Sequence, residues 1–179
     1  MLFLLVLMGA GLMHGCKKEE TPKKSLAEYK KETIMGSWKQ KGIKLGVSTT
    51  VKVGSNKIPL KAGMSMLDDP TINMLLNAMG GNPFPLTRNN KYKFNSDGTY
   101  AVEGVNSGLA QVGVSPIFAG DAGTWESEVF GSVLALFPQP DKRDPHWINS
   151  INSTEINLAI VIKLPGLGDV PMNLVLQKQ

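Results

Sequence analysis

Apolar and polar residues alternate through the second half of the chain, and this alternation predicts β-strands. In the stretch STEINLAIVIKL an apolar residue recurs at every second position from Ile156 to Leu164. The turn PGLGD separates this run from VPMNLVLQK, where the same pattern returns. A strand with one apolar face and one mixed face is typical of an antiparallel sheet. The pattern therefore predicts two closing antiparallel strands within residues 155–178.

Further strands are indicated upstream. The stretch NNKYKFNSDGTYAVEG places Asp97-Gly98 between two alternating runs, which predicts a hairpin whose two turn residues both take positive φ. AGTWESEV, GSVLALF, STTVKV and NKIPL also read as strands, whereas the alternation that follows Trp38 is ambiguous. We count eight to ten strands between residues 38 and 178. This count and spacing predict an all-β, antiparallel sandwich or barrel.

Two segments have helical rather than strand periodicity. Ser25 followed by Glu28 forms a capping-box pattern and predicts a short N-terminal helix. In DDPTINMLLNAMGG, Asp69 is a candidate N-cap, Pro70 suits the first helical position, and the apolar residues from Ile72 to Met79 fall on one side. A helix with one apolar side must pack against another part of the protein. It could close one mouth of a barrel, act as a lid, or serve as static cover.

The N-terminus has a sharp boundary between apolar and charged residues. Residues 2–13 are almost entirely apolar, and Lys-Lys-Glu-Glu follows the sole cysteine, Cys16. A run of about 12 apolar residues is shorter than the roughly 20 that a membrane-spanning helix needs, and it suits a secretion signal. Gly15-Cys16 at its end resembles the lipobox of bacterial lipoproteins, which implies acylation of Cys16; an ordinary thiol is the alternative. We expect a signal peptide over 1–15, a lipidated charged tether and short helix over 16–32, and one domain over 33–179.

Charge argues against a nucleic-acid partner. The net charge of the chain is +4, and residues 17–31 carry six lysines against three glutamates, so most of the excess lies in the tether. A nearly neutral domain lacks the basic surface of a nucleic-acid binder, whereas a basic tether suits anionic lipid head groups. The Lys-Lys-Glu-Glu run also resembles the charged tags that send some lipoproteins to the outer face of the cell. We expect a lipid-anchored protein of the cell envelope, in the outer membrane and exposed at the surface if the tag acts as an export signal.

The residue inventory also limits the chemistry. Once residues 1–16 are removed, His146 is the one histidine and no thiol remains, so two-histidine zinc sites and Cys/His nucleophile pairs are excluded. We expect no metal, no cofactor and no enzymatic activity. His146 lies among Pro138, Pro140 and Pro145, which predicts a surface loop. The carboxylates Glu103, Asp121, Glu126 and Glu128 show no spacing that selects acid–base chemistry.

Taken together, the tether, the short helix, the Gly-Ser-Trp at residues 36–38, the hairpin, AGTWE and the closing strand pair resemble the lipocalin-like domains of bacterial lipoproteins. The resemblance spans residues 33–177 and implies an up-and-down β-barrel. It also implies that Gly36 and Trp38 form the motif at the closed end of the barrel, with the Trp38 ring packed beneath a basic side chain from a late strand. Lys178 is the candidate for that side chain.

Two functions of different classes remain open. The first is binding of a small apolar or amphipathic ligand inside the barrel, and the second is docking of a packed, ligand-free barrel onto an envelope protein through the loops 104–121 and 138–146. The candidate lining of a ligand site consists of the inward-facing large side chains, each of which would serve equally well as core: Tyr92, Phe94, Tyr100, Trp125, Ile156, Leu158, Ile160, Met172 and Leu174.

Overall fold

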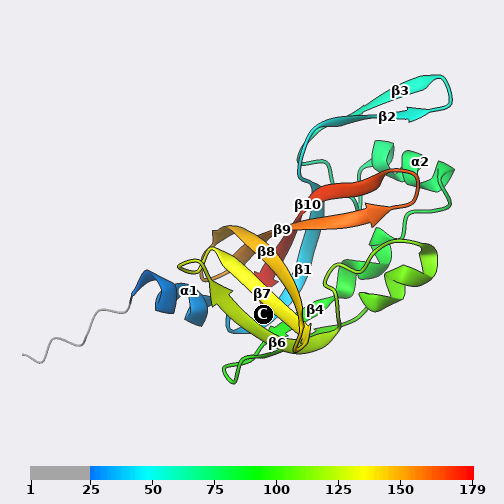
Figure 1. The fold of residues 1–179 in the computed structure, drawn as a ribbon. Coiled ribbons are helices and arrows are strands. Elements are labelled where there is room, and N and C mark those ends of the chain that lie inside the picture. The colour runs from blue at the N-terminus through cyan, green and yellow to red at the C-terminus, as the bar shows by residue number, and fades with distance from the viewer. Residues whose placement is uncertain (1–24) are drawn as a thin grey trace, which may run out of the picture.

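Eight antiparallel strands form a closed barrel in the computed structural model, which describes residues 25–179 (Figure 1). The order around the barrel is β1-β10-β9-β8-β7-β6-β5-β4, and β4 pairs back onto β1. The strands are β1 (Gly36–Leu45), β4 (Lys91–Phe94), β5 (Thr99–Glu103), β6 (Ala122–Glu128), β7 (Val133–Gln139), β8 (Lys142–Ile151), β9 (Glu155–Leu164) and β10 (Gly168–Lys178). The predicted all-β, up-and-down antiparallel barrel is confirmed.

Strands β9 and β10 follow the predicted alternation closely. All five inward residues of β9, from Ile156 to Leu164, are buried, and they pair in register with β10 along its length. Strand β1 is different because its register with β10 shifts between Gln40 and Gly42. Trp38 and Gln40 face inward before this bulge, and Ile43 and Leu45 face inward after it. A bulge reverses the phase of the alternation, which explains why the sequence pattern after Trp38 is ambiguous.

The hairpin of β4 and β5 lies where the Asp-Gly pair predicts it, but the turn is of another type. Gly98 alone has positive φ, at 82°, and Asp97 does not. The backbone N–H of Gly98 donates to Asn95 O over 3.1 Å, and Asn95 N–H donates to Thr99 O over 2.8 Å. The loop is therefore a three-residue connection with its glycine in the left-handed position, a common alternative to the two-residue turn.

Two helices, one separate hairpin and two short 3-10 helices complete the fold. The helix α1 (Leu26–Ile34) has the predicted capping box, in which Ser25 Oγ accepts from Glu28 N–H. The helix α2 (Pro70–Ala78) is capped by Asp69 as predicted. Strands β2 (Thr49–Val53) and β3 (Asn56–Leu60) form a two-stranded sheet outside the barrel. The 3-10 helices are η1 (Phe84–Asn89) and η2 (Ser107–Val112). In Figure 1, α1 lies at one end of the molecule, and α2 with the β2–β3 hairpin at the other.

The prediction of a surface loop around His146 is wrong. Segment 138–146 is the end of β7 and the first half of β8, and His146 is buried within β8. Pro145 is tolerated because this half of β8 pairs with β7 alone; pairing with β9 begins at Trp147. A strand segment with one free side does not need every backbone N–H. The loop 104–121 contains η2 but is otherwise irregular, as expected.

Candidate functional site

The closed end of the barrel is the end that α1 covers. Trp38 is fully buried there, and its Nε1–H donates to Ile34 O of α1 over 2.7 Å. Lys178 Nζ lies 4.4 Å from the centre of the Trp38 ring, so Lys178 takes the place of the expected basic partner. The same ammonium donates to Thr33 O over 3.1 Å and to Met35 O, at the C-terminal end of α1. Burial lowers the pKa of Lys178, and the carbonyls and the Trp38 ring compensate for the lost hydration.

The nine candidate lining residues all lie in the barrel core. Each is buried, and the rings of Phe94 and Trp125 meet edge to face with their centres 5.7 Å apart. The Tyr92 hydroxyl donates to Gln40 Oε1 over 2.9 Å, and burial raises the pKa of Tyr92. Among the four hollows described for residues 25–179, only one is lined by any of the nine, namely by Ile160 and Met172. The other seven pack against one another and their neighbours in the core.

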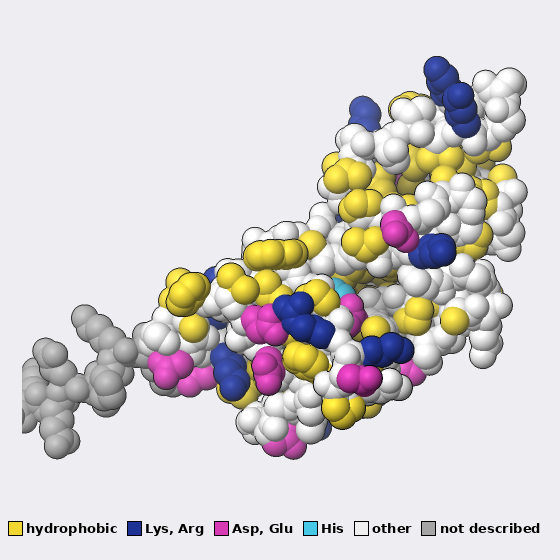
Figure 2. Space-filling model, viewed as in Figure 1, with side chains coloured by type: hydrophobic (Ala, Val, Ile, Leu, Met, Phe, Trp, Pro, Cys, Tyr) yellow, Lys and Arg dark blue, Asp and Glu magenta, His cyan; other side chains and the backbone are white. Residues whose placement is uncertain are grey.

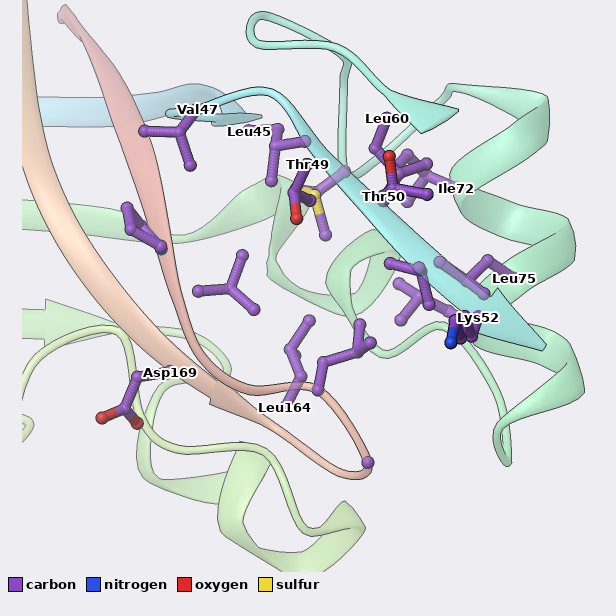
Figure 3. Close-up of a pocket in the computed structure, with 17 residues that line it drawn as sticks. Leu45, Val47, Thr49, Thr50, Lys52, Leu60, Ile72, Leu75, Leu164 and Asp169 are labelled. Carbon is purple, nitrogen blue, oxygen red and sulfur yellow. The ribbon is translucent and has the colours of Figure 1, made fainter. Parts of the chain in front are cut away.

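Another hollow, lined by none of the nine residues, lies at the end of the barrel opposite α1, and we call it the mouth hollow (Figure 3). Its volume is about 450 Å³. Its walls come from the end of β1, the hairpin of β2 and β3, the helix α2, and the tip where β9 turns into β10. The apolar part of the lining is Leu45, Val47, Val51, Leu60, Met66, Ile72, Leu75, Leu76, Leu164, Leu167, Val170 and Pro171, and the polar part includes Thr49, Thr50, Lys52 and Asp169.

Local sequence features hold these walls in place. Asp69 Oδ1 accepts from the backbone N–H groups of Thr71 and Ile72, which fixes the start of α2 with its buried side toward the hollow. Gly46 N–H donates to Pro171 O over 2.9 Å, and a Cβ at Gly46 would meet that oxygen at 3.0 Å. A glycine is therefore needed where the chain leaves β1 and turns toward β2. The hairpin and the helix thus extend the barrel beyond its own rim.

A second hollow, which we call the outer hollow, has a volume of about 700 Å³. It opens where β8 and β9 separate, and its lining includes the exposed Trp147 and Val161 together with Ser115 and the buried His146. The segment that follows η2 lies in this gap, because Ser115 N–H donates to Lys163 O over 3.1 Å. The barrel wall is therefore completed at this point by a loop.

His146 and Asp144 form a polar pair beside the outer hollow. His146 Nε2 lies 3.0 Å from Asp144 Oδ2, although the angle is not that of a hydrogen bond. Burial alone would raise the pKa of Asp144, but His146 and the Ala119 N–H outweigh it, so the pKa lies below its ordinary value. Burial, with the nearby Asp144 and Asp121, raises the pKa of Tyr100 to about 12.

Within residues 25–179 no hydroxyl is hydrogen-bonded to His146 of this pair. Ser115 lies in the same hollow, but its Oγ accepts from Lys163 N–H, and no hydrogen bond joins it to His146 among the described residues. A nucleophile and its base must be within hydrogen-bond reach of each other. Residues 25–179 also hold no cluster of three histidine, cysteine, aspartate or glutamate side chains that could bind a metal.

Glu128 and Asp121, two of the four carboxylates named from the sequence, have ordinary partners. Glu128 forms an ion pair with Arg143, which lowers the pKa of Glu128. Asp121 accepts from Asn106 Nδ2 over 2.7 Å and from the backbone N–H of Ser107 over 3.1 Å; these bonds and the Ser107 hydroxyl outweigh the effect of burial and lower its pKa. These carboxylates stabilise loops and strand pairs. Cys16 lies outside the described residues.

The architecture defines the class of the protein as a closed, eight-stranded antiparallel β-barrel, compatible with a calycin-type fold. The search of known families matched no family model, and no curated protein matches the chain. The helices within residues 25–179 are all too short or too polar to cross a membrane. Because neither comparison found a match, a function must be inferred from the barrel, its closed end and the mouth hollow.

Proposed function

We propose that the chain is a lipid-anchored, lipocalin-like protein of the cell envelope that binds a small apolar or amphipathic ligand without catalysis. The ligand occupies the mouth hollow rather than the core of the barrel. Acylated Cys16 holds the protein in the outer membrane, and the charged tether that follows supports exposure at the surface. Neither nucleic acid nor a cofactor takes part.

One observation carries this proposal, namely a hollow of about 450 Å³ whose lining is mainly aliphatic. Ligand pockets commonly have volumes of roughly 300 to 1,000 Å³ and apolar walls with a few polar groups. Thr49, Thr50, Lys52 and Asp169 supply such groups. They favour a ligand that has an apolar body and one polar end. Because α2 forms one wall, its movement would control access if it acts as a lid.

The proposal is tested by filling the hollow. Val170 is half-buried and lines it, so Val170→Trp places a large ring in the open space and should lower the uptake of an apolar fluorescent probe. Met74→Trp is the matched control, because Met74 is 59% exposed on α2 and is not part of the lining. Unchanged uptake by the Val170→Trp protein, or no uptake by the unsubstituted protein, would contradict the proposal. Mass spectrometry of gently purified protein would identify a bound molecule.

A second candidate function is docking onto an envelope protein. It is favoured by the packed interior around the nine core residues and by Trp147, which is 59% exposed at the outer hollow. Aromatic side chains of this kind are common in protein interfaces. In this case Trp147→Ala should abolish recovery of a partner from cross-linked envelopes and leave probe uptake unchanged. Unchanged partner recovery together with reduced probe uptake would favour the ligand-binding function.

A further inference from the structure

The turn between β6 and β7 combines two unfavourable features in the same two residues. Val129 and Phe130 have φ of 49° and 54°, and they are the only residues other than glycine with positive φ within residues 25–179. Phe130 is also 84% exposed and Val129 is 54% exposed. Left-handed backbone favours glycine, asparagine and aspartate, and it is an outlier for β-branched or bulky residues. Val129 and Phe130 therefore combine a strained backbone with apolar side chains that are exposed to water.

The closure of the turn does not require these side chains. Ser132 N–H donates to Glu128 O and to Val129 O, each over 3.1 Å, and these bonds involve backbone atoms alone. Asparagine and glycine adopt left-handed backbone at less cost than valine and phenylalanine, so they would suit these two positions better. Strained positions that persist in a fold are often sites of function. The identity of the two side chains therefore needs an explanation outside the turn.

The turn lies against α1 at the closed end of the barrel. A Cβ on Gly131 would meet the Lys30 side chain at 2.7 Å, which shows how closely the turn and the helix pack. Leu26 is one helical turn before Lys30, on the same side of α1, and is exposed. We call Leu26, Val129 and Phe130 the tip patch. Figure 2 shows hydrophobic side chains exposed at the end of the molecule that carries α1.

The excess positive charge near the tip patch comes from the sequence that leads into α1. On α1 itself Lys30 and Lys31 are balanced by Glu28 and Glu32, whereas residues 17–24 carry four lysines against two glutamates. Glu128, beside the turn, is paired with Arg143. Apolar side chains next to lysines are typical of segments that lie in the interface of a bilayer, where the rings enter the acyl region and the ammonium groups contact head groups.

We propose that the tip patch contacts a lipid bilayer of anionic composition, with Phe130 and Val129 inserted at the interface. Lipid is chosen as the partner because residues 1–24, which lead into α1, contain the expected anchor, and in this respect the inference rests on the proposed function. The closed end of the barrel then faces the membrane. The mouth hollow, at the opposite end, faces away from it and remains open to the surroundings (Figure 1).

Vesicle sedimentation tests the contact without the anchor. A chain that begins at Lys17 keeps every residue of the closed barrel and its core, and it lacks Cys16. It should sediment with vesicles of phosphatidylethanolamine and phosphatidylglycerol, and less with phosphatidylcholine alone. Phe130→Ser should weaken this binding by about tenfold, because burial of one phenylalanine side chain is worth at least this factor. The control is Met74→Ser, which removes an exposed side chain at the other end of the molecule and should bind as the parent does.

A double variant separates binding from folding. Val129→Asn with Phe130→Gly suits the left-handed turn, so the thermal midpoint should stay the same or rise while vesicle binding is lost. Equal sedimentation of the parent and the double variant, or an equal loss in Met74→Ser, would overturn the lipid contact. The chain used here has no anchor, so a negative result would concern the tip patch alone. Acylation of Cys16 and ligand binding in the mouth hollow are tested separately.

Discussion

Trp38 joins three elements at the scale of a single residue. Its indole N–H holds the end of α1, its ring lies under the Lys178 ammonium, and its backbone lies in β1 between β10 and β4. A fully buried ring with a satisfied N–H contributes both packing and a hydrogen bond. We therefore assign Trp38 a structural role, which matches its place in the resemblance to lipocalins.

Trp38→Ala should lower the free energy of unfolding by roughly 3 to 5 kcal/mol, as truncations of large buried aromatic residues do. The control is Trp147→Ala, because Trp147 is exposed on β8 and its truncation leaves no buried cavity. Chemical denaturation of both variants, compared at equal m-value, measures the difference. Similar midpoints for the two variants would show that the closed end does not depend on the Trp38 ring.

At the scale of elements, the sequence predicts best where one periodicity runs unbroken. The strand β9 keeps period two from Ile156 to Leu164, and α2 has both its cap and its apolar side. In β1 the bulge after Gln40 reverses the pattern. In β8, Pro145 resembles a loop residue because a sequence cannot show that this half of the strand lacks a second neighbour.

The candidate site was harder to predict for a related reason. Alternation shows which side chains face inward, but not whether the space between them is filled. Leu158 and Leu174 both face inward and are packed within the core. The mouth hollow is formed by segments far apart in the chain, such as Val51 of β2, Leu75 of α2 and Leu164 of β9. Only the tertiary arrangement of the hairpin and the helix creates it.

The helix α2 gives a prediction at this scale. Asp69→Ala removes the side chain that accepts from two backbone N–H groups, and loss of such a cap lowers stability by about 1 kcal/mol. The neighbouring variant Asp68→Ala is the control, since Asp68 pairs with Arg88 at the exposed surface and its loss should hardly change stability. Thermal unfolding compares them. An Asp69→Ala protein as stable as the Asp68→Ala protein would show that the cap contributes little.

At the scale of the whole molecule, the two ends of the barrel differ in structure. The end under α1 is tightly packed around Trp38, and the other end is widened by the β2–β3 hairpin and α2 around the mouth hollow. An anchor before α1 and a ligand at the opposite end would then act without obstructing one another. Substitutions at one end should therefore affect anchoring without changing ligand binding at the other.

Cys16→Ser tests the anchor in the cell. The substitution removes the thiol that would carry the acyl chains, so the protein should move from the membrane fraction to the soluble fraction. Each buried methylene of such a chain contributes about 0.8 kcal/mol, and stable attachment needs more than one chain. Fractionation after a carbonate wash measures the change. Lys17→Ser, one residue further along, keeps the thiol and should stay with the membrane. A Cys16→Ser protein that remains membrane-bound after the wash would contradict lipidation.

The closure of β1 onto β10 also sets an order of events during biogenesis. Trp38 pairs with Lys178, so the edge of β1 that faces β10 stays uncovered until the last strand has been made. Contacts between such distant parts of a chain form slowly, and exposed strand edges invite aggregation in the meantime. A chain that crosses a membrane unfolded would thus need protection until β10 has emerged.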